Sequence, residues 1–255
     1  MTDRKAALVT GGARRIGRAI ALALHRAGYV VAIQANRSLA EAEALREEIT
    51  RERGRAAVVR ADLADHSAVS GLVAGAVDAV GPLSLLVNNA AMFEPDAIGA
   101  LDAERFDRQF AVNLRAPLFL SEAFAAQAQN LSEDLGASIV NILDQRVFKV
   151  TPHFVSYTLA KSALHSATRM LAQALAPKVR VNAVAPGPTM ASARQAADDF
   201  ARQAAAVPLG HGPTAEEVAE AVVYLASARS VTGATLVIDG GQHLAWQTPD
   251  AITKE

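Results

Sequence analysis

The chain has 255 residues, of which 51% are hydrophobic and 20% charged, so it can build a large core and is not a disordered chain. Its 25 Lys and Arg against 26 Asp and Glu leave a net charge of −1, which gives no strong field toward nucleic acid or an anionic membrane. The absence of cysteine excludes disulfides, a thiol nucleophile and cysteine-ligated zinc. No signal-peptide pattern is present, and the apolar stretch 68–87 is broken by Asp78 and Gly81-Pro82, so we expect a cytoplasmic protein.

Predicted strands and helices alternate along the chain. The apolar run 5–10 ends at Gly11-Gly12, which predicts a buried strand and a tight turn, and helical spacing follows over 15–27. Further strands are predicted at 29–35, 56–60, 84–87, 138–143, 179–184 and 235–238. Further helices are predicted at 38–53, 67–80, 102–129 (one helix, or two joined near Val112-Asn113), 155–176 and 215–226. Ser38 would cap the first of these, and Thr214 with Glu217 would form a capping box on the last.

This alternation predicts an α/β fold with one doubly wound parallel sheet, because the strands read as buried on both faces. The connections are short and without linkers or repeats, so residues 1–255 are expected to form one domain. Residues 187–212 are the exception, since they are rich in Ala, Gln and Asp and are broken between Pro208 and Pro213. We expect a partly helical lid there, over a site at the carboxyl ends of the strands.

The turn after the first strand, residues 10–17, has the sequence TGGARRIG. Glycines at such a turn let backbone N–H groups approach a pyrophosphate, and the following helix N-terminus favours its charge. An ordinary βα turn that contains glycine is the alternative. The strand before it, the helix after it and the second strand from residue 29 favour the dinucleotide site.

The end of the second strand distinguishes the two nicotinamide cofactors. An acidic residue there holds the ribose 2′-hydroxyl of NAD, but this chain has Arg37-Ser38. An Arg and a hydroxyl at a helix N-terminus suit the 2′-phosphate of NADP(H), with Arg14 and Arg15 as further cations. The alternative is a solvated Arg37 and a Ser38 that only caps the helix.

Tyr157 and Lys161 lie four residues apart, on one face of a predicted helix. A nearby cation stabilises a phenolate, so Lys161 is expected to lower the pKa of Tyr157 and make it a proton donor and acceptor near neutrality. Alone, this spacing is a weak signal.

Further motifs follow along the chain: Asn88-Asn89-Ala90, Asn113, Pro186-Gly187 and Asp239-Gly240-Gly241. Together with the glycine turn and the Tyr157/Lys161 pair, they occur in the order and spacing of the short-chain dehydrogenases/reductases. The whole chain resembles this family. The resemblance implies a seven-stranded Rossmann-type sheet in the order 3-2-1-4-5-6-7, a nicotinamide cofactor and a homotetramer. Its seam would lie on helices 102–129 and 155–176. Tyr157 would be the acid/base, Lys161 would hold the ribose and tune Tyr157, and Asn113 would support a water linked to Lys161.

The same resemblance implies a set of cofactor-binding residues. These are Gly11, Arg15, Ile16, Gly17, Arg37, Ser38, Asp62, Leu63, Asn89, Ala90, Tyr157, Lys161, Pro186, Gly187 and Thr189.

Two positions depart from the general family pattern. Arg15 stands where the turn has a glycine, and Asp144 stands where the catalytic Ser precedes the Tyr by thirteen residues. Both departures occur together in the pteridine reductases and the bacterial dihydromonapterin reductases, which the chain resembles. Phe93 matches the aromatic that sandwiches the pterin against the nicotinamide. The substrate-binding residues implied are Arg15, Phe93, Asp144 and Tyr157.

The expected activity is NADPH-dependent reduction of a pteridine or dihydropteridine of the dihydrobiopterin, dihydromonapterin or dihydrofolate type. The cofactor would give hydride to a ring C=N carbon, Tyr157 would donate the proton, and Asp144 would orient Tyr157 and accept N–H groups of the pterin. The alternatives are a carbonyl or 3-oxoacyl reductase, which expects Ser at 144, and a dinucleotide-binding protein without turnover. Asp144 as a capping carboxylate and Phe93 as a packing residue are the structural alternatives.

The six histidines show no ligand spacing, so no metal is expected.

Overall fold

The computed structural model describes residues 5–129, 131–132, 135–192 and 194–246. Seven parallel strands form one sheet in the order β3-β2-β1-β4-β5-β6-β7, as predicted. The strands are β1 (Ala6–Val9), β2 (Val30–Ala35), β3 (Ala56–Arg60), β4 (Leu85–Asn88), β5 (Ser138–Ile142), β6 (Arg180–Pro186) and β7 (Thr235–Ile238). Each bound lies within about two residues of its predicted position.

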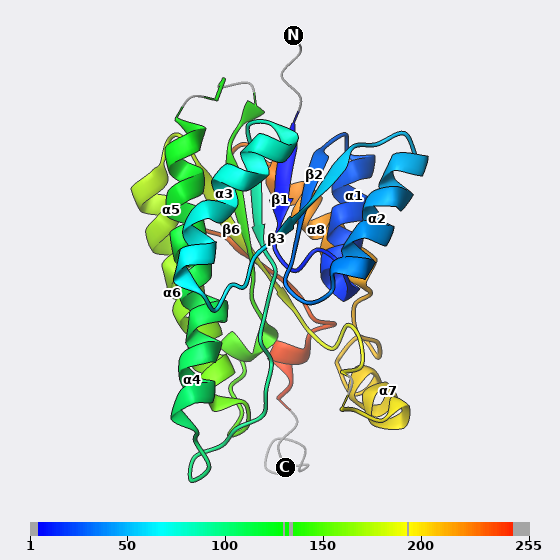
Figure 1. The fold of residues 1–255 in the computed structure, drawn as a ribbon. Helices are drawn as coiled ribbons and strands as arrows, with labels where there is room; N and C mark the ends of the chain where they lie inside the picture. The colour runs from blue at the N-terminus through cyan, green and yellow to red at the C-terminus, as the bar shows by residue number, and fades with distance from the viewer. Residues whose placement is uncertain (1–4, 130, 133–134, 193, 247–255) are drawn as a thin grey trace, which may run out of the picture.

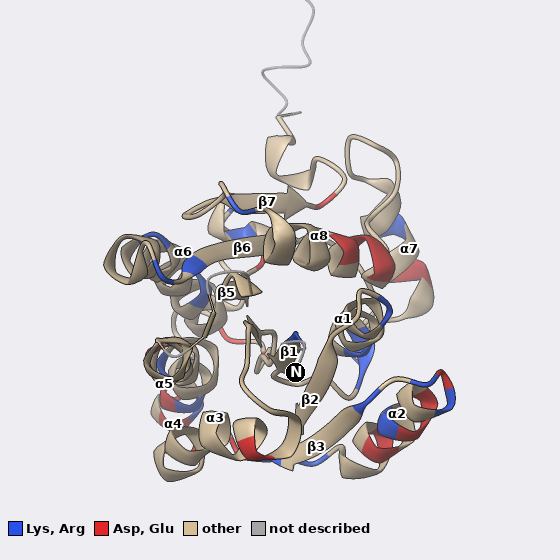
Figure 2. Cartoon of the chain, turned by 90° about the horizontal axis from the view of Figure 1, so that it is seen from above, with Lys and Arg blue, Asp and Glu red and all other residues tan. Residues whose placement is uncertain are grey.

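Helices cover both faces of the sheet (Figures 1 and 2). On one face lie α1 (Arg15–Arg26), α2 (Leu39–Arg51) and α8 (Ala215–Ser227), and on the other lie α3 (His66–Val80), α5 (Ala116–Ala128) and α6 (Val155–Leu175). The predicted helix 102–129 consists of α4 (Ala103–Phe110), a π-helical segment η1 (Ala111–Arg115) and α5, so it is interrupted where Val112-Asn113 suggested. Further helical elements in the described part of the chain are η3 (Gln145–Val147), α7 (Ala197–Ala205) and η4 (Gln242–Leu244).

The core forms two apolar layers because each strand buries alternate side chains on opposite faces. Leu8 of β1 lies beside Leu86 of β4 in the layer under α3 and α5. The next residue in each strand, Val9 and Val87, packs in the other layer with α1 and α8. Parallel strands buried on both faces read as continuous apolar runs, which is the pattern of the sequence.

Two of the predicted helix caps differ in their contacts. Thr214 and Glu217 form the capping box on α8, which confirms that prediction. Ser38 occupies the N-cap position of α2, but its side chain makes no capping hydrogen bond. Among the described residues, no helix combines the length and apolar character needed to cross a bilayer.

The direction of the strands positions the site. All seven run in parallel, so the loops that follow them gather at one end of the sheet, the lower end in Figure 1. β1 has β2 on one side and β4 on the other, and the chain order reverses at this point. Ligands of doubly wound folds bind in the crevice at such a reversal.

Candidate active site

The glycine turn after β1 is shaped for close backbone approach. Gly11 has a positive φ of 60°, and a Cβ on Gly17 would lie 2.1 Å from the carbonyl oxygen of Gly11. The amide of Gly11 donates to Oε1 of Gln34 at 2.8 Å, and Asn89 Nδ2 donates to the carbonyl of Thr10 at 2.8 Å. The turn opens directly into α1, so its shape fits the pyrophosphate of a dinucleotide.

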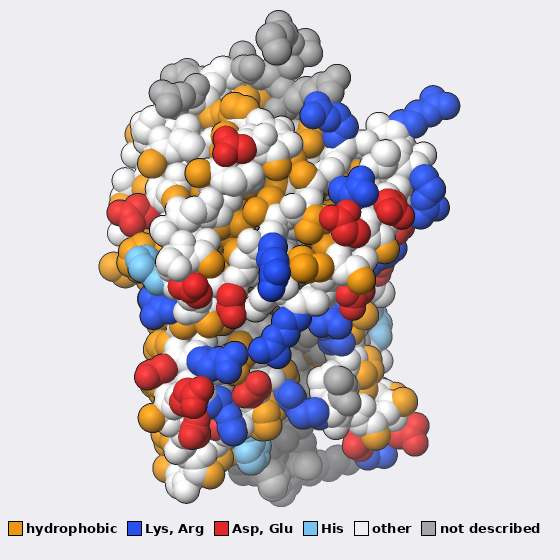
Figure 3. All heavy atoms as spheres, viewed as in Figure 1, with side chains coloured by type: hydrophobic (Ala, Val, Ile, Leu, Met, Phe, Trp, Pro, Cys, Tyr) orange, Lys and Arg blue, Asp and Glu red, His pale blue; other side chains and the backbone are white. Residues whose placement is uncertain are grey.

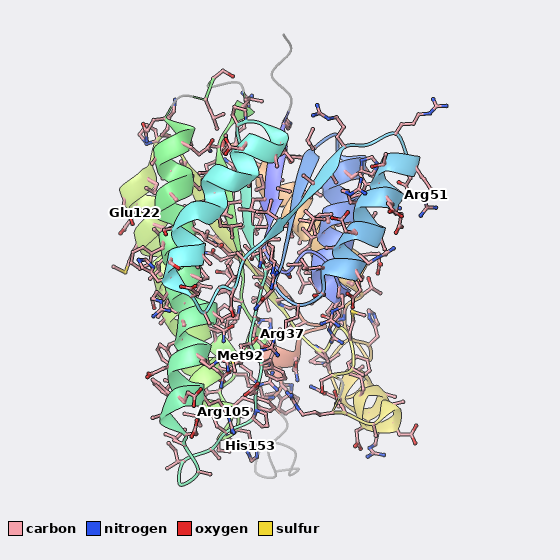
Figure 4. All side chains as sticks on the ribbon, viewed as in Figure 1. Arg37, Arg51, Met92, Arg105, Glu122 and His153 are labelled. Atoms are coloured by element: carbon pink, nitrogen blue, oxygen red, sulfur yellow. The ribbon has the colours of Figure 1, made fainter. Side chains whose placement is uncertain are left out.

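The ends of β2 and β3 lie next to this turn. Arg37 is exposed and lies at the carboxyl end of the sheet (Figure 4), on a face where Lys and Arg side chains gather among acidic ones (Figure 3). Ser38 is partly buried and leaves its hydroxyl without a capping bond. Asp62 accepts the amide of Ala64 at 2.9 Å and shapes the turn in which Leu63 is buried. β2 and β3 pair up to Ala35 and Arg60, so the cofactor-binding residues expected after these two strands are neighbours.

Tyr157, Lys161 and Asp144 come together as expected. Tyr157 Oη donates to Oδ2 of Asp144 at 3.1 Å, which joins the start of α6 to the loop after β5. Lys161 Nζ lies 5.9 Å from the centre of the Tyr157 ring and donates to the carbonyl of Ile142 at 2.6 Å. Tyr157 is 5% exposed and Lys161 is 1% exposed.

Burial changes the proton affinities of both groups. Burial raises the pKa of Tyr157 well above its usual 10.0, and the charge and hydrogen bond of Asp144 raise it further, while Arg146 lowers it. The predicted lowering of the Tyr157 pKa by Lys161 is therefore wrong for this state of the protein. Burial lowers the pKa of Lys161 to about 8, against the opposing effect of Asp144. Tyr157 is a protonated phenol at neutral pH, ready to donate.

Arg146 is a member of the site that the sequence analysis missed. Its Nη1 lies 3.3 and 3.4 Å from the two carboxylate oxygens of Asp144, and its amide donates to Oδ1 of Asp144 at 2.9 Å. Asp144 therefore also caps the short helix η3, so the structural alternative for this residue is correct as well. Proximity in sequence is the one signal that could have paired these two residues.

An aromatic cluster lies beside this carboxylate. The Phe93 ring stacks on Phe154 with centroids 4.2 Å apart and meets the Tyr157 ring edge-on at 4.7 Å. The guanidinium carbon of Arg146 lies 5.3 Å from the Phe93 centroid. Phe93 lines the cavity, as a substrate-stacking ring would, and it also packs on Phe154, as a structural residue would. Each of the two interpretations therefore describes part of its surroundings. Phe154 was not predicted.

Arg15 contacts the segment that follows β6. It has a positive φ of 55°, and its guanidinium donates to the carbonyls of Ala191 at 2.7 Å and Met190 at 2.9 Å. Arg194 donates from the same segment to the carbonyl of Phe93, across the cavity. Two arginines thus connect residues 187–195 to both walls of the site. From the sequence, Arg15 was expected to contact the substrate or the cofactor.

Asn113 lies in the π-helical segment η1 and is completely buried. Both ends of its amide pair with the backbone of Met92, at 3.0 and 2.9 Å, so its side chain holds the loop after β4. Asn113 is not among the residues that line the cavity. The water that the resemblance assigns to it stays a prediction.

The cavity between these elements has a volume of about 650 Å³. Its wall includes Arg15, Ile16, Asn89, Phe93, Asp144, Tyr157, Lys161, Pro186, Gly187 and Thr189. Gly187 allows close packing, because a Cβ there would lie 2.7 Å from Cα of Asp239. Residues predicted from five separate segments thus meet around one space large enough for a flat heterocycle beside a nicotinamide.

The chain resembles known reductases over nearly its whole length. Residues 11–243 match the family model described as Enoyl-(Acyl carrier protein) reductase. The solved structure of FolM alternative dihydrofolate reductase 1 from Brucella suis, in complex with NADP, is 52% identical, with a TM-score of 0.92 over 98% of this chain and 99% of that one. Pteridine reductase 1 of Leishmania tarentolae is 35% identical over 280 residues, 93% of this chain and 96% of that protein. L-xylulose reductase of Bos taurus is 36% identical over 242 residues, 92% of this chain and 95% of that protein. The chain belongs to the short-chain dehydrogenase/reductase family.

Proposed function

We propose that this protein is an NADPH-dependent reductase of a pteridine or dihydropteridine. The observation that carries the proposal is the position of Asp144, whose carboxylate accepts the Tyr157 phenol and is paired with Arg146 at the cavity wall. A carboxylate accepts hydrogen bonds where the serine of the general family pattern would donate one. It therefore suits a substrate edge rich in N–H groups, which a 2-amino-4-oxopteridine supplies.

Bound NADPH supplies the hydride to a C=N carbon of the substrate ring. The phenol of Tyr157 is held protonated by burial and by Asp144, so it is the proton donor to the ring nitrogen. Lys161 lies on the same helix face with its ammonium directed to the end of β5, where it would hold the ribose hydroxyls. The ring of Phe93 at the cavity wall would stack on the heterocycle.

Arg37 and Ser38 support NADPH as the cofactor. Neither side chain is engaged in a helix cap, and the position has no carboxylate to accept a ribose 2′-hydroxyl. The NADP complex of the Brucella suis relative, 52% identical, supports the same choice.

The dihydrofolate reductase name of that relative and the pteridine reductase name of the Leishmania tarentolae relative support a pterin-type substrate. The similarity to L-xylulose reductase supports a carbonyl reductase as the second candidate. That reaction would use the same phenol of Tyr157, but a carboxylate at position 144 would repel the negative charge that develops on a reduced carbonyl oxygen.

Two further expectations remain proposals. Residues 187–212 contain α7 and carry contacts to both walls of the cavity, which supports their assignment as a lid. A homotetramer with its seam on α5 and α6 is proposed from the family resemblance. Phe119 and Met170, exposed on these two helices, are consistent with a covered face.

NADPH oxidation, followed with dihydrobiopterin, dihydromonapterin, dihydrofolate and a simple ketone in parallel, tests the proposal. We expect turnover with at least one of the pterins and a much lower kcat/KM with the ketone. A reaction without enzyme serves as the control for non-enzymatic oxidation of NADPH, and Tyr157→Phe serves as the control for turnover through the phenol. Efficient ketone reduction without pterin turnover would make the carbonyl reductase the better assignment.

A further inference from the structure

The N-terminus of α6 presents backbone donors that its own N-cap residue cannot satisfy. Phe154 occupies the N-cap in a left-handed conformation, with φ 58° and ψ 46°, and its side chain has no polar atom. The first N–H groups of a helix have no partner within the helix. Tyr157, the proton donor, lies in this first turn, so whatever holds the turn also holds the phenol.

The missing acceptor comes from the loop after β4, sixty residues earlier. Both carboxylate oxygens of Asp96 accept the amide of Ser156, at 3.2 and 3.3 Å, and the Ser156 hydroxyl donates to Oδ2 of Asp96. The carbonyl of Asp96 accepts the amide of Phe154 at 2.8 Å. Asp96 is 9% exposed and Ser156 is completely buried. The carboxylate is also attracted to the positive end of the helix dipole.

The same loop fixes the other side of the phenol. Phe93, three residues before Asp96, stacks on Phe154 and meets the Tyr157 ring edge-on. Arg105 of α4 holds the loop from outside by donating to the carbonyl of Pro95 at 3.3 Å. Figure 4 shows Met92, Arg105 and His153 together at this end of the molecule. One short loop therefore determines both the start of α6 and the packing around Tyr157.

We propose that Asp96 is a positioning residue: by holding Ser156 it places the phenol of Tyr157 against Asp144 and in line for proton donation. This rests on the assignment of Tyr157 as the proton donor, which the pteridine and carbonyl reductase reactions share. A merely structural cap should contribute to stability alone. We expect this of Asp65, whose carboxylate accepts the amide of Ser67 at 2.9 Å and its hydroxyl at 2.8 Å at the exposed start of α3.

The first test compares Asp96→Ala, Asp96→Asn and the matched control Asp65→Ala. Asp96→Ala should lower kcat ten- to a hundredfold, on the order of the loss from a misplaced catalytic group. KM for NADPH should stay within about twofold. Asp96→Asn keeps an acceptor for Ser156 and should recover most of the lost kcat. Asp65→Ala should keep the kcat of the parent at saturating NADPH, even if it melts at a lower temperature.

The same substitution made in the Tyr157→Phe background separates positioning from stability. If Asp96 acts through the phenol, Asp96→Ala should change kcat far less in that background than in the parent. An equal loss in both backgrounds would overturn the proposal, and so would a kcat of Asp96→Ala equal to that of the parent.

A measurement without substrate keeps the proposal independent of the proposed reaction. The chain has three tyrosines, so protein with ¹³Cζ-labelled tyrosine gives few signals, and Tyr157→Phe assigns the one of interest. In the parent that signal should stay in the protonated position through pH 10, because burial and Asp144 raise the pKa of Tyr157. In Asp96→Ala it should shift and titrate at lower pH, while Asp65→Ala should leave it unchanged. An unchanged signal in Asp96→Ala would refute the positioning role, whichever substrate the enzyme reduces.

Discussion

Lys161 costs the protein stability, and this cost is measurable. The side chain is 1% exposed, and burial lowers its pKa from 10.5 to about 8. One pKa unit corresponds to about 1.4 kcal/mol, so keeping the ammonium charged inside the fold at pH 7 costs on the order of 3 kcal/mol. Lys161→Met removes the charge and keeps a side chain of similar length. The variant also loses the hydrogen bond to Ile142, which offsets about 1 kcal/mol. We therefore expect Lys161→Met without cofactor to be more stable than the parent by about 2 kcal/mol at pH 7, although it is catalytically impaired.

The pH dependence has a definite sign. Between about pH 8 and 10.5 the unfolded chain still binds the Lys161 proton while the folded protein has released it. The free energy of unfolding of the parent should therefore rise with pH across this window relative to Lys161→Met, so the advantage of the variant should shrink above pH 8. Below pH 8 both states are protonated and the difference should be constant.

Urea unfolding of both proteins at fixed concentration, from pH 7 to 10, measures this difference. All other titrating groups are shared, so the difference reports Lys161 alone. A Lys161→Met variant that is less stable than the parent at pH 7, with a difference independent of pH, would refute the reasoning.

Three further predictions follow from the site, and a fourth follows from the family resemblance. Arg37→Ala should raise KM for NADPH by roughly ten- to a hundredfold, the value of a charge-assisted bond to phosphate, and leave KM for NADH nearly unchanged; equal changes for both cofactors would contradict it. Tyr157→Phe should lower kcat by about a hundredfold or more while NADPH still binds, as fluorescence titration would show. Arg15→Ala releases the carbonyls of Met190 and Ala191, so it should increase proteolysis within residues 187–212, and an unchanged cleavage rate would argue against a held lid. Sedimentation at micromolar concentration should give a tetramer, and a stable monomer would exclude it.

The sequence predicted the fold closely because the dominant signals were local. Apolar runs of four to seven residues between helical patterns are characteristic of a buried parallel sheet, and the capping box of Thr214 and Glu217 lies within one turn. The predicted contact of Tyr157 with Asp144 is also present. It could be predicted because the thirteen-residue spacing of the two residues is part of the family resemblance.

The features that the sequence did not predict depend on burial or on distant contacts. The direction of the Tyr157 pKa was predicted wrongly because spacing along a helix shows the nearby lysine but not how deeply the phenol is buried. The contacts of Arg15 with the backbone of Met190 and Ala191 span more than 170 residues. A contact between a side chain and a distant backbone group cannot be recognised from the residue types in the sequence. The same reason explains why the pairing of Asp96 with the amide of Ser156 was not predicted.

We propose that Asp144 makes this site selective for a pterin. The most direct test is the ratio of kcat/KM for a dihydropterin to that for a ketone, measured in the parent and in Asp144→Ser. A serine hydroxyl donates to a carbonyl oxygen but cannot replace a carboxylate toward N–H groups, so dihydropterin reduction should fall by roughly tenfold or more in the variant. Ketone reduction should appear or rise, and the ratio should fall. Full dihydropterin activity of Asp144→Ser, with an unchanged ratio, would contradict the account.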